Sequence, residues 1–383
     1  MKLLHIADLH IGKHVNEFNM FEDQKHVLEQ ILQMSEIEKP DVLLIAGDVY
    51  DKNQPSVEAV ELLDFFLTKL TALVPHVFMI SGNHDSLERL SFGSKIMEKN
   101  GLYIARAFDG VLQKVTLEDQ HGIVNIYMLP FMKPAMVKRF FQQQIESYDE
   151  ALRAVISSTE IDTKERNILI AHQFVVNGTQ QPERSESESL CVGGLDNVDA
   201  SAFEAFDYVA LGHLHRPQRI GRDTICYSGS PLKYSFSEAR HQKSAILLDL
   251  SVKSELLIYQ LPLIPLHDLR EIKGPITELL SIGREETDGS QDYIHATLTD
   301  EEEIYDVIGQ LRQVYPNLMS LDFENNRSKQ SVFSPINAYS DVARKSPMDL
   351  FSEFYQIQNN DELTLKQVHV MEQIFEQAGG PII

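Results

Sequence analysis

Cysteine is scarce in this chain. Only Cys191 and Cys226 occur among its 383 residues, and neither belongs to a spacing that is typical of metal sites. The scarcity argues against a disulfide framework and against a thiolate zinc site, and it is typical of proteins from a reducing compartment. We therefore expect a cytoplasmic protein.

Long hydrophobic runs are also missing. The chain starts with an apolar stretch, but Asp8 and His10 interrupt it too early for a signal peptide. Elsewhere no run approaches the roughly 20 apolar residues that a membrane helix requires. The sequence therefore predicts no membrane segment.

Basic residues are few compared with acidic ones. The chain has 34 Lys and Arg against 57 Asp and Glu, which gives a formal net charge of −23. A chain with this balance does not attract nucleic acid through its overall field. If the substrate is a polyanion, a local site, bound metal cations or a partner protein must supply the attraction.

A repeated pattern stands out against these absences: short apolar runs end in Asp, Asn or His. Val42–Ala46 leads into Gly47-Asp48, and Val77–Ile80 leads into Gly82-Asn83-His84-Asp85. Apolar runs that stop at a glycine are typical of buried parallel strands, and ligands bind at the carboxyl ends of such strands. The same pattern recurs at Leu3–Ala7 before Asp8 and His10, at Ile168–Ala171 before His172, and at Tyr208–Leu211 before His213 and His215.

These polar strand ends are too many to be explained by packing. A buried charge or imidazole costs several kcal/mol unless it is paired or bound to metal. A single buried histidine is usually a hydrogen-bonded core residue, and we interpret His5 in this way. Five polar ends at one sheet edge instead predict a shared metal site.

The first part of the chain alternates strands with helices, which predicts a layered α/β core. Helical spacing of apolar residues predicts helices over 21–38, 56–73, 86–100 and 140–156. Ser56 is the expected N-cap of the second of these helices. Further strands are expected over 111–117, 123–129, 227–236, 245–250 and 256–261.

Pro262 and Pro265 mark a domain boundary. We expect an α/β domain over 1–262 and a small α/β capping domain over 263–324, followed by a polar linker over 325–345 and a helical hairpin over 346–383. In the capping domain, strands over 293–298 and 318–323 flank an expected helix over 301–314. The hairpin starts at Ser346-Pro347 and contains a capping box from Thr364 to Gln367. Because two short helices bury little apolar surface alone, we expect it to dock on a partner protein.

The polar motifs taken together resemble the signature of the calcineurin-like metallophosphoesterases. The resemblance covers about the first 215 residues and implies a layered metallophosphoesterase sandwich. A narrower similarity, to the bacterial nuclease branch of this family, includes the N-terminal LLHIADLHIGK, the Gly-Ser-Pro sequence at 229–231, the small domain and the terminal hairpin. The matching motifs are Asp8-x-His10, Gly47-Asp48-x-x-Asp51, Gly82-Asn83-His84-Asp85, His172 and Gly212-His213-x-His215.

The resemblance assigns a role to each of these residues. Asp48 would bridge two divalent metal ions, Asp8, His10 and His215 would complete one site, and Asn83, His172 and His213 would complete the other. Oxygen and imidazole donors suit manganese, iron or zinc, and we favour manganese. His84 matches the non-ligand histidine that protonates the leaving group, and Asp51 matches a carboxylate that orients that histidine in several relatives.

The resemblance also implies an activity and partners. We expect a DNA nuclease of repair and recombination, with double-strand exonuclease and single-strand or hairpin endonuclease activity. A coiled-coil ATPase would bind the terminal hairpin, and the chain would be a homodimer within a heterotetramer. Two alternatives are a small-substrate phosphodiesterase or phosphatase, which would need no docking hairpin, and a non-catalytic scaffold, which would not need the full ligand set.

Asp85 and the polar loop over 177–190 receive structural interpretations. Asp85 would cap the helix that follows it. The polar loop over 177–190, which is rich in Gln, Ser and Glu, would be solvated. Substrate contacts are the alternative for this loop, because it follows a ligand-bearing strand.

Overall fold

The computed structural model describes residues 1–188, 196–253, 255–286, 289, 291–325, 348–352, 355 and 363–377. The chain divides into two units, Met1–Leu269 and Arg270–Ile383. Within the described residues, no helix combines the length and the apolar character that crossing a membrane would require.

The first unit is built on two six-stranded sheets. One sheet has the order β16 (Leu256–Pro262), β15 (Ser244–Leu250), β1 (Lys2–Ile6), β4 (Val42–Ala46), β5 (His76–Ile80) and β6 (Leu102–Ile104). The other has the order β13 (Gln218–Ile220), β14 (Arg222–Tyr227), β12 (Tyr208–Gly212), β9 (Arg166–His172), β8 (Gly122–Leu129) and β7 (Gln113–Asp119).

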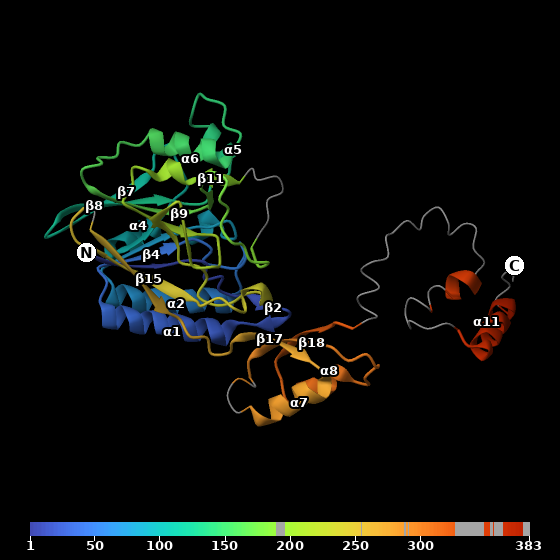
Figure 1. The fold of residues 1–383 in the computed structure, drawn as a ribbon. Coiled ribbons are helices and arrows are strands. Elements are labelled where there is room, and N and C mark those ends of the chain that lie inside the picture. The colour runs from blue at the N-terminus through green and yellow to red at the C-terminus, as the bar shows by residue number, and fades with distance from the viewer. Residues whose placement is uncertain are drawn as a thin grey trace. The chain divides into compact units, whose positions relative to one another are not determined.

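The two sheets face each other across a shared apolar core. Leu3, Val42 and Phe78 of the first sheet belong to the same buried cluster as Ile168 and Tyr208 of the second. Helices α1 (Phe21–Glu38) and α2 (Val57–Leu73) lie side by side on the outer face of the first sheet (Figure 1). The outer face of the second sheet packs against α6 (Tyr148–Ser157). This sandwich confirms the predicted layered α/β fold.

Parallel pairing brings the carboxyl ends of the central strands together. In the first sheet β1, β4, β5 and β6 run parallel, and in the second β8, β9, β12 and β14 do. Gly212, at the end of β12, is the register partner of His172, at the end of β9. The loops that follow these strands therefore meet at one edge of the sandwich.

Smaller elements complete this unit. Two short strand pairs are β2 (His14–Val15) with β3 (Phe18–Asn19), and β10 (Phe174–Val176) with β11 (Asn197–Asp199). The short helices are α3 (Leu87–Leu90), α4 (Ser94–Met97), η1 (Glu98–Asn100), α5 (Pro134–Lys138), η2 (Ala200–Phe203) and η3 (Phe236–Glu238).

Several sequence predictions are confirmed. Helix α1 has the predicted bounds, and Ser56 accepts a hydrogen bond from the Ala59 amide at the start of α2. The strands expected over 111–117 and 123–129 form as β7 and β8, which pair antiparallel, and β7 starts at Gln113. The His5 ring is buried and lies 3.0 Å from the Tyr208 hydroxyl, which confirms its role as a core residue.

Three predicted elements are wrong. The helix over 86–100 is broken into α3, α4 and η1, because Gly93 adopts a left-handed conformation with φ 74°. The helix over 140–156 starts only at Tyr148, where Ser147 and Glu150 form a capping box. The strand predicted over 227–236 lies earlier in the chain. The observed strand β14 ends at Tyr227, because the chain turns at Gly229, whose φ is 76°.

The second unit contains a three-stranded sheet in the order β17 (Leu269–Gly274), β18 (Tyr293–Leu298) and β19 (Leu318–Phe323), with α7 (Ile276–Glu285) and α8 (Val307–Arg312). Its core includes Ile294, Leu311 and Tyr315. The helix predicted over 301–314 is shorter than expected, because the Asp306 carboxylate accepts a hydrogen bond from the Gly309 amide and starts the helix there.

The C-terminal segment contains helix α11 (Leu365–Gln377). Thr364 and Gln367 bond each other reciprocally at its start, as the predicted capping box requires. The Phe351 and Phe375 rings lie 6.4 Å apart, so the described parts of the hairpin pack together. The predicted linker after residue 325 and the Ser346-Pro347 cap lie outside the described residues, and the predicted domain limits stay a prediction.

Candidate metal centre

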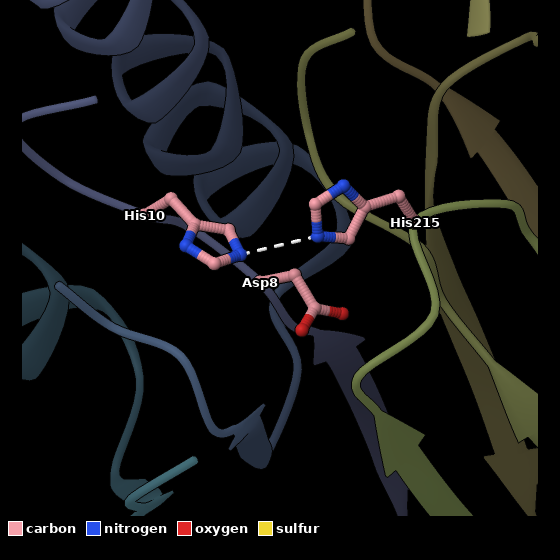
Figure 2. Close-up of side chains that lie close together, drawn as sticks. All are labelled: Asp8, His10 and His215. Carbon is pink, nitrogen blue, oxygen red and sulfur yellow. Dashed lines mark hydrogen bonds between the residues drawn. The ribbon is translucent and has the colours of Figure 1, made fainter. Parts of the chain in front are cut away.

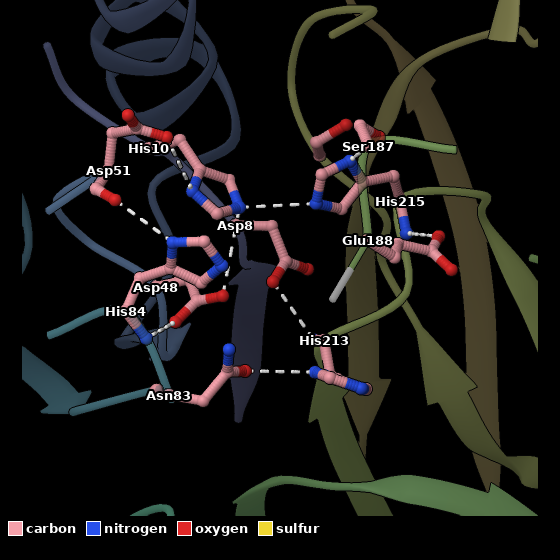
Figure 3. Close-up of polar contacts among 12 residues, drawn as sticks. Asp8, His10, Asp48, Asp51, Asn83, His84, Ser187, Glu188, His213 and His215 are labelled. Carbon is pink, nitrogen blue, oxygen red and sulfur yellow. Dashed lines mark hydrogen bonds and ion pairs between the residues drawn. The ribbon is translucent and has the colours of Figure 1, made fainter. Parts of the chain in front are cut away.

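Every candidate ligand lies at the carboxyl edge of the sandwich. Six of them come from the loops after β1, β4, β5 and β12 (Figure 3). The seventh, His172, stands at the end of β9. Asp8, His10 and His172 have no exposed surface, and Asp48 and His215 are buried almost as deeply. The structure thus brings together the predicted set of Asp8, His10, Asp48, Asn83, His172, His213 and His215.

The loops that carry the ligands are held in unusual backbone conformations. Asp8, His10, Asp48 and His213 all have positive φ, between 45° and 100°. Left-handed backbone is unfavourable for residues other than glycine and persists only where the surroundings enforce it. Here the Asp8 amide donates to the Gly47 carbonyl at 3.1 Å, and the His10 amide donates to the Asp48 carbonyl at 2.9 Å. The two loops therefore fix each other's ligands.

Glycine is needed where these loops come closest. A side chain at Gly82 would place its Cβ 2.1 Å from the Asp48 carboxylate. A Cβ at Gly212 would lie 2.0 Å from the Ala46 carbonyl oxygen. Both distances are far too short, so the two glycines allow the strand ends to converge.

One group of donors consists of Asp8, His10 and His215 (Figure 2). The Nε2 atoms of the two histidines are 3.1 Å apart. Oδ2 of Asp8 is buried and has no hydrogen-bond partner among the described residues. A buried carboxylate oxygen beside two facing imidazole nitrogens fits a divalent cation.

A second group surrounds Asp48 and His172. Nε2 of His172 lies 3.3 Å from Oδ2 of Asp48, and Oδ1 of Asn83 lies 3.0 Å from both Nε2 of His172 and Nδ1 of His213. Oδ2 of Asp48 is also 3.7 Å from Nε2 of His10, which belongs to the first group. Asp48 therefore lies between the two groups, where a bridging carboxylate would have to be.

The electrostatics of the site also fit a bound cation. Burial raises the pKa of Asp8 to about 7, although His172 and His215 oppose this rise. Burial lowers the pKa of His213, the charge of His172 adds to this, and the resulting pKa is about 3. Burial also lowers the pKa of His172, but Asp48 outweighs it and brings the value to about 9. A divalent cation would keep the carboxylates ionised and the imidazoles neutral.

Asp51 contacts His84 through its main chain, and its expected role as an orienting carboxylate stays a prediction. Its main-chain carbonyl accepts a hydrogen bond from Nδ1 of His84, at 2.9 Å. The carboxylate lies 2.8 Å from the Lys13 ammonium and 3.6 Å from Nδ1 of His10. Asp51 thus orients His84 through its backbone, while its side chain faces Lys13 and His10.

The position of His84 allows two roles. Its ring nitrogen is close enough to the donor atoms of His10 and Asp48 for the three to hold a metal ion together. However, it is more exposed than either of them. Its assignment as a proton donor outside the ligand set stays a prediction.

The sequence did not reveal the role of Asp85. Its carboxylate accepts hydrogen bonds from the amides of Val49, Tyr50 and Gly82, at 2.9–3.1 Å. Helix α3 is capped by Ser86 instead. Asp85 therefore joins the loop after β4 to the loop after β5. In the sequence, only its position next to the ligands in the Gly-Asn-His-Asp motif indicated a role at the site.

Two family models match this chain. Residues 1–217 match the family described as calcineurin-like phosphoesterase. Residues 265–359 match the family described as type 5 capsule protein repressor C-terminal domain. The first match contains every predicted metal ligand.

Individual named proteins are also similar to this chain. The SbcD subunit of the nuclease SbcCD of Staphylococcus epidermidis is 36% identical over 99% of this chain and 100% of its own length. The protein with the same name from Staphylococcus saprophyticus is 33% identical over 98% of this chain and 97% of its own length. Among solved structures, a dimetal phosphatase from Danio rerio aligns with a TM-score of 0.42 and 13% identity, over 69% of this chain and 96% of that chain.

Proposed function

Since this chain belongs to the calcineurin-like phosphoesterase family, and to the SbcD nucleases within it, we propose that it is a two-metal DNA nuclease that works as one component of a larger complex. The observation that carries the proposal is the convergence of a complete set of carboxylate, amide and imidazole donors at one sheet edge. We propose manganese as the metal, because the carboxylate and amide oxygens of Asp8, Asp48 and Asn83 are donors of the type that it prefers.

The mechanism follows from where the side chains lie. These donors would hold two divalent cations, which when bound would stabilise the negative charge of a phosphate and lower the pKa of a water molecule. Asp48, between the donor groups, would fix the spacing of the two sites. The carbonyl of Asp51 accepts the Nδ1 proton of His84, so a proton for the leaving sugar oxygen would come from Nε2 of the imidazolium form, in which both ring nitrogens are protonated.

Two other functions fit the site less well. A small-substrate phosphodiesterase or phosphatase would use the same donors but would not require a second unit and a terminal hairpin. A non-catalytic scaffold would not require a complete donor set. The near full-length match to SbcD nucleases favours the first proposal.

The purified chain tests this function directly. With Mn2+ we expect it to cleave linear duplex and hairpin DNA, and we expect EDTA to abolish cleavage. Because the net charge is −23, the chain alone should bind DNA weakly, and an SbcC-like ATPase should strengthen binding and cleavage. Hydrolysis of bis-p-nitrophenyl phosphate without cleavage of DNA, with the partner present, would favour the small-substrate alternative.

We propose that the terminal hairpin binds this ATPase. On helix α11, Val370 and Ile374 remain 52% and 48% exposed, while Phe375 packs on Phe351. Residues four apart share one helix face, so these two side chains form an apolar face that a coiled coil could cover.

Replacing Val370 and Ile374 together by Asp should abolish co-purification with the ATPase. The hydrolysis of bis-p-nitrophenyl phosphate by the isolated chain should not change, because the helix lies outside the metal-binding unit. Lys366→Asp, at an exposed position of the same helix, is the matched control for added negative charge. Unchanged complex formation by the double variant would contradict the proposal.

A homodimer within a heterotetramer is the assembly that we propose. In the first unit the apolar side chains of Val60, Phe92 and Met97 line one surface hollow and are 37–83% exposed. Exposed apolar side chains that gather near one another mark interaction surfaces, and a two-fold dimer would bury the same patch on both copies. We propose that this assembly acts in the cytoplasm, in DNA repair, recombination and replication.

A further inference from the structure

A buried ion pair lies behind the metal ligand His215. Glu238 and Lys243 are 0% and 4% exposed, and Oε2 of Glu238 lies 2.5 Å from Nζ of Lys243. The same ammonium also donates to the His215 carbonyl at 2.7 Å and to Oγ of Ser230 at 2.8 Å. Three acceptors thus use all three protons of the ammonium group.

Ser187 connects this pair to the imidazole of His215. Its Oγ lies 2.7 Å from Nδ1 of His215 and 2.5 Å from Oε1 of Glu238. An ionised carboxylate can only accept hydrogen bonds, so the serine must donate its one proton to Glu238. Oγ is then left to accept a hydrogen bond, which Nδ1 of His215 must donate.

This arrangement determines which nitrogen of His215 can bind metal. A neutral imidazole carries one proton, and here that proton is held on Nδ1. The lone pair is therefore on Nε2, which faces Nε2 of His10 inside the donor group (Figure 3). The backbone of His215 is held as well, since its amide donates to the Glu188 carboxylate at 2.8 Å.

Part of the polar loop that was expected to be solvated therefore lies against the metal centre. Ser185, Ser187 and Glu188 are in the 177–190 segment, and Ser185 and Glu188 are buried. The sequence could not show this, because Ser187 is 28 residues from His215 and 51 residues from Glu238.

We propose that Ser187 and Glu238, balanced in charge by Lys243, are positioning residues that set the tautomer and orientation of His215 for metal binding. This proposal depends on the proposed function in one respect, that His215 is a metal ligand. Removing a partner that orients a metal-binding histidine typically weakens metal affinity by about 10- to 100-fold.

Ser187→Ala is the sharpest test, because it removes the hydroxyl bridge without removing a charge and leaves only the longer direct contact, 3.4 Å, between Nδ1 of His215 and Oε1 of Glu238. We expect the metal-free variant to melt near the wild-type temperature, but to bind Mn2+ about 10-fold more weakly or worse in calorimetric titrations. Nitrogen chemical shifts of the His215 ring in the metal-free protein should show a loss of the Nδ1-protonated form. Ser187→Thr keeps a hydroxyl group, so this variant should retain the Mn2+ affinity and the Nδ1-protonated form of His215 that the wild type shows.

Ser185→Ala is the matched control. Ser185 lies in the same loop and is buried, but its hydroxyl has no hydrogen-bond partner among the described residues. This variant should bind Mn2+ like the wild type. An equal loss of affinity in both alanine variants would assign the effect to the loop as a whole and overturn the proposal.

The Glu238–Lys243 pair needs a second comparison, because a broken buried ion pair destabilises the fold by itself. Lys243→Met alone should lower the melting temperature, and Glu238→Met with Lys243→Met should recover much of it. We expect Mn2+ binding to remain weak in the double variant. If affinity recovers together with melting temperature, the pair is structural only and the proposal fails.

His215→Ala distinguishes a wrong positioning role for Ser187 from a wrong assignment of His215 as a metal ligand. His215→Ala should reduce bound Mn2+ in elemental analysis. If it does not, the ligand assignment is wrong. If it does, while Ser187→Ala binds Mn2+ like the wild type, the ligand assignment stands and the positioning role is wrong.

Discussion

Replacing Asp48 by Ala should remove metal and activity together. Oδ2 of Asp48 lies 3.3 Å from Nε2 of His172 and 3.7 Å from Nε2 of His10, so it can serve both donor groups. Its other oxygen accepts a hydrogen bond from the His84 amide at 2.9 Å. Loss of the Asp48 carboxylate would therefore disturb both metal sites and the backbone position of His84.

We expect the metal content of this variant to fall and the single-turnover rate to drop by roughly 10³-fold or more. Metal ions contribute several kcal/mol to stabilising the transition state, and each 1.36 kcal/mol corresponds to a factor of ten in rate. Elemental analysis and cleavage assays on the same preparation are the measurements. Asp41→Ala, at the opposite end of strand β4, removes a carboxylate that caps the Lys2 amide and should leave both values unchanged. Full metal content in the Asp48 variant would rule out the bridging role.

His84→Ala should separate metal binding from catalysis. If His84 donates a proton to the leaving oxygen, its loss should lower the cleavage rate by roughly 10²-fold or more. Metal content and DNA affinity should stay close to the wild-type values, because the carboxylates and the other imidazoles remain in place. The measurements are metal stoichiometry and single-turnover cleavage, as for the Asp48 variant.

Two results would contradict this assignment of His84. Its distance to His10 and Asp48 permits a ligand role, and a loss of metal from His84→Ala would establish that role. A wild-type rate would mean that water protonates the leaving group. His14→Ala is the matched control, since His14 is an exposed histidine near the site and should affect neither measurement.

The ligand-bearing edge could be predicted because its signal is local. Each apolar run and the polar residues after it are contiguous in the chain, and parallel strands place their carboxyl ends together. Helix α1 was predicted with its correct bounds for the same reason, since its apolar spacing is uninterrupted. The calcineurin-like resemblance then assigned roles that spacing alone could not.

The errors arose where a local signal competed with another. The helix predicted from Phe140 followed apolar spacing, but the capping box at Ser147 and Glu150 starts the helix later. Asp85 seemed to be a helix cap, yet Ser86 occupies that position and Asp85 bonds three amides. The contacts of Glu238 to Ser187 could not be foreseen, because nothing in either segment indicates that the fold brings them together.

The distance along the chain between the ligands has a consequence for protein synthesis. The His213 amide bonds the Asp8 carboxylate across 205 positions of sequence, and strand β1 pairs with β15, which ends only at Leu250. A nascent chain that has not yet emerged past His215 lacks part of the donor set, and one that has not emerged past Leu250 lacks the strands that pair beyond β1 in its first sheet. Incomplete chains on the ribosome should therefore be unable to cut nucleic acid, and nuclease activity should arise only once the whole first unit has been released.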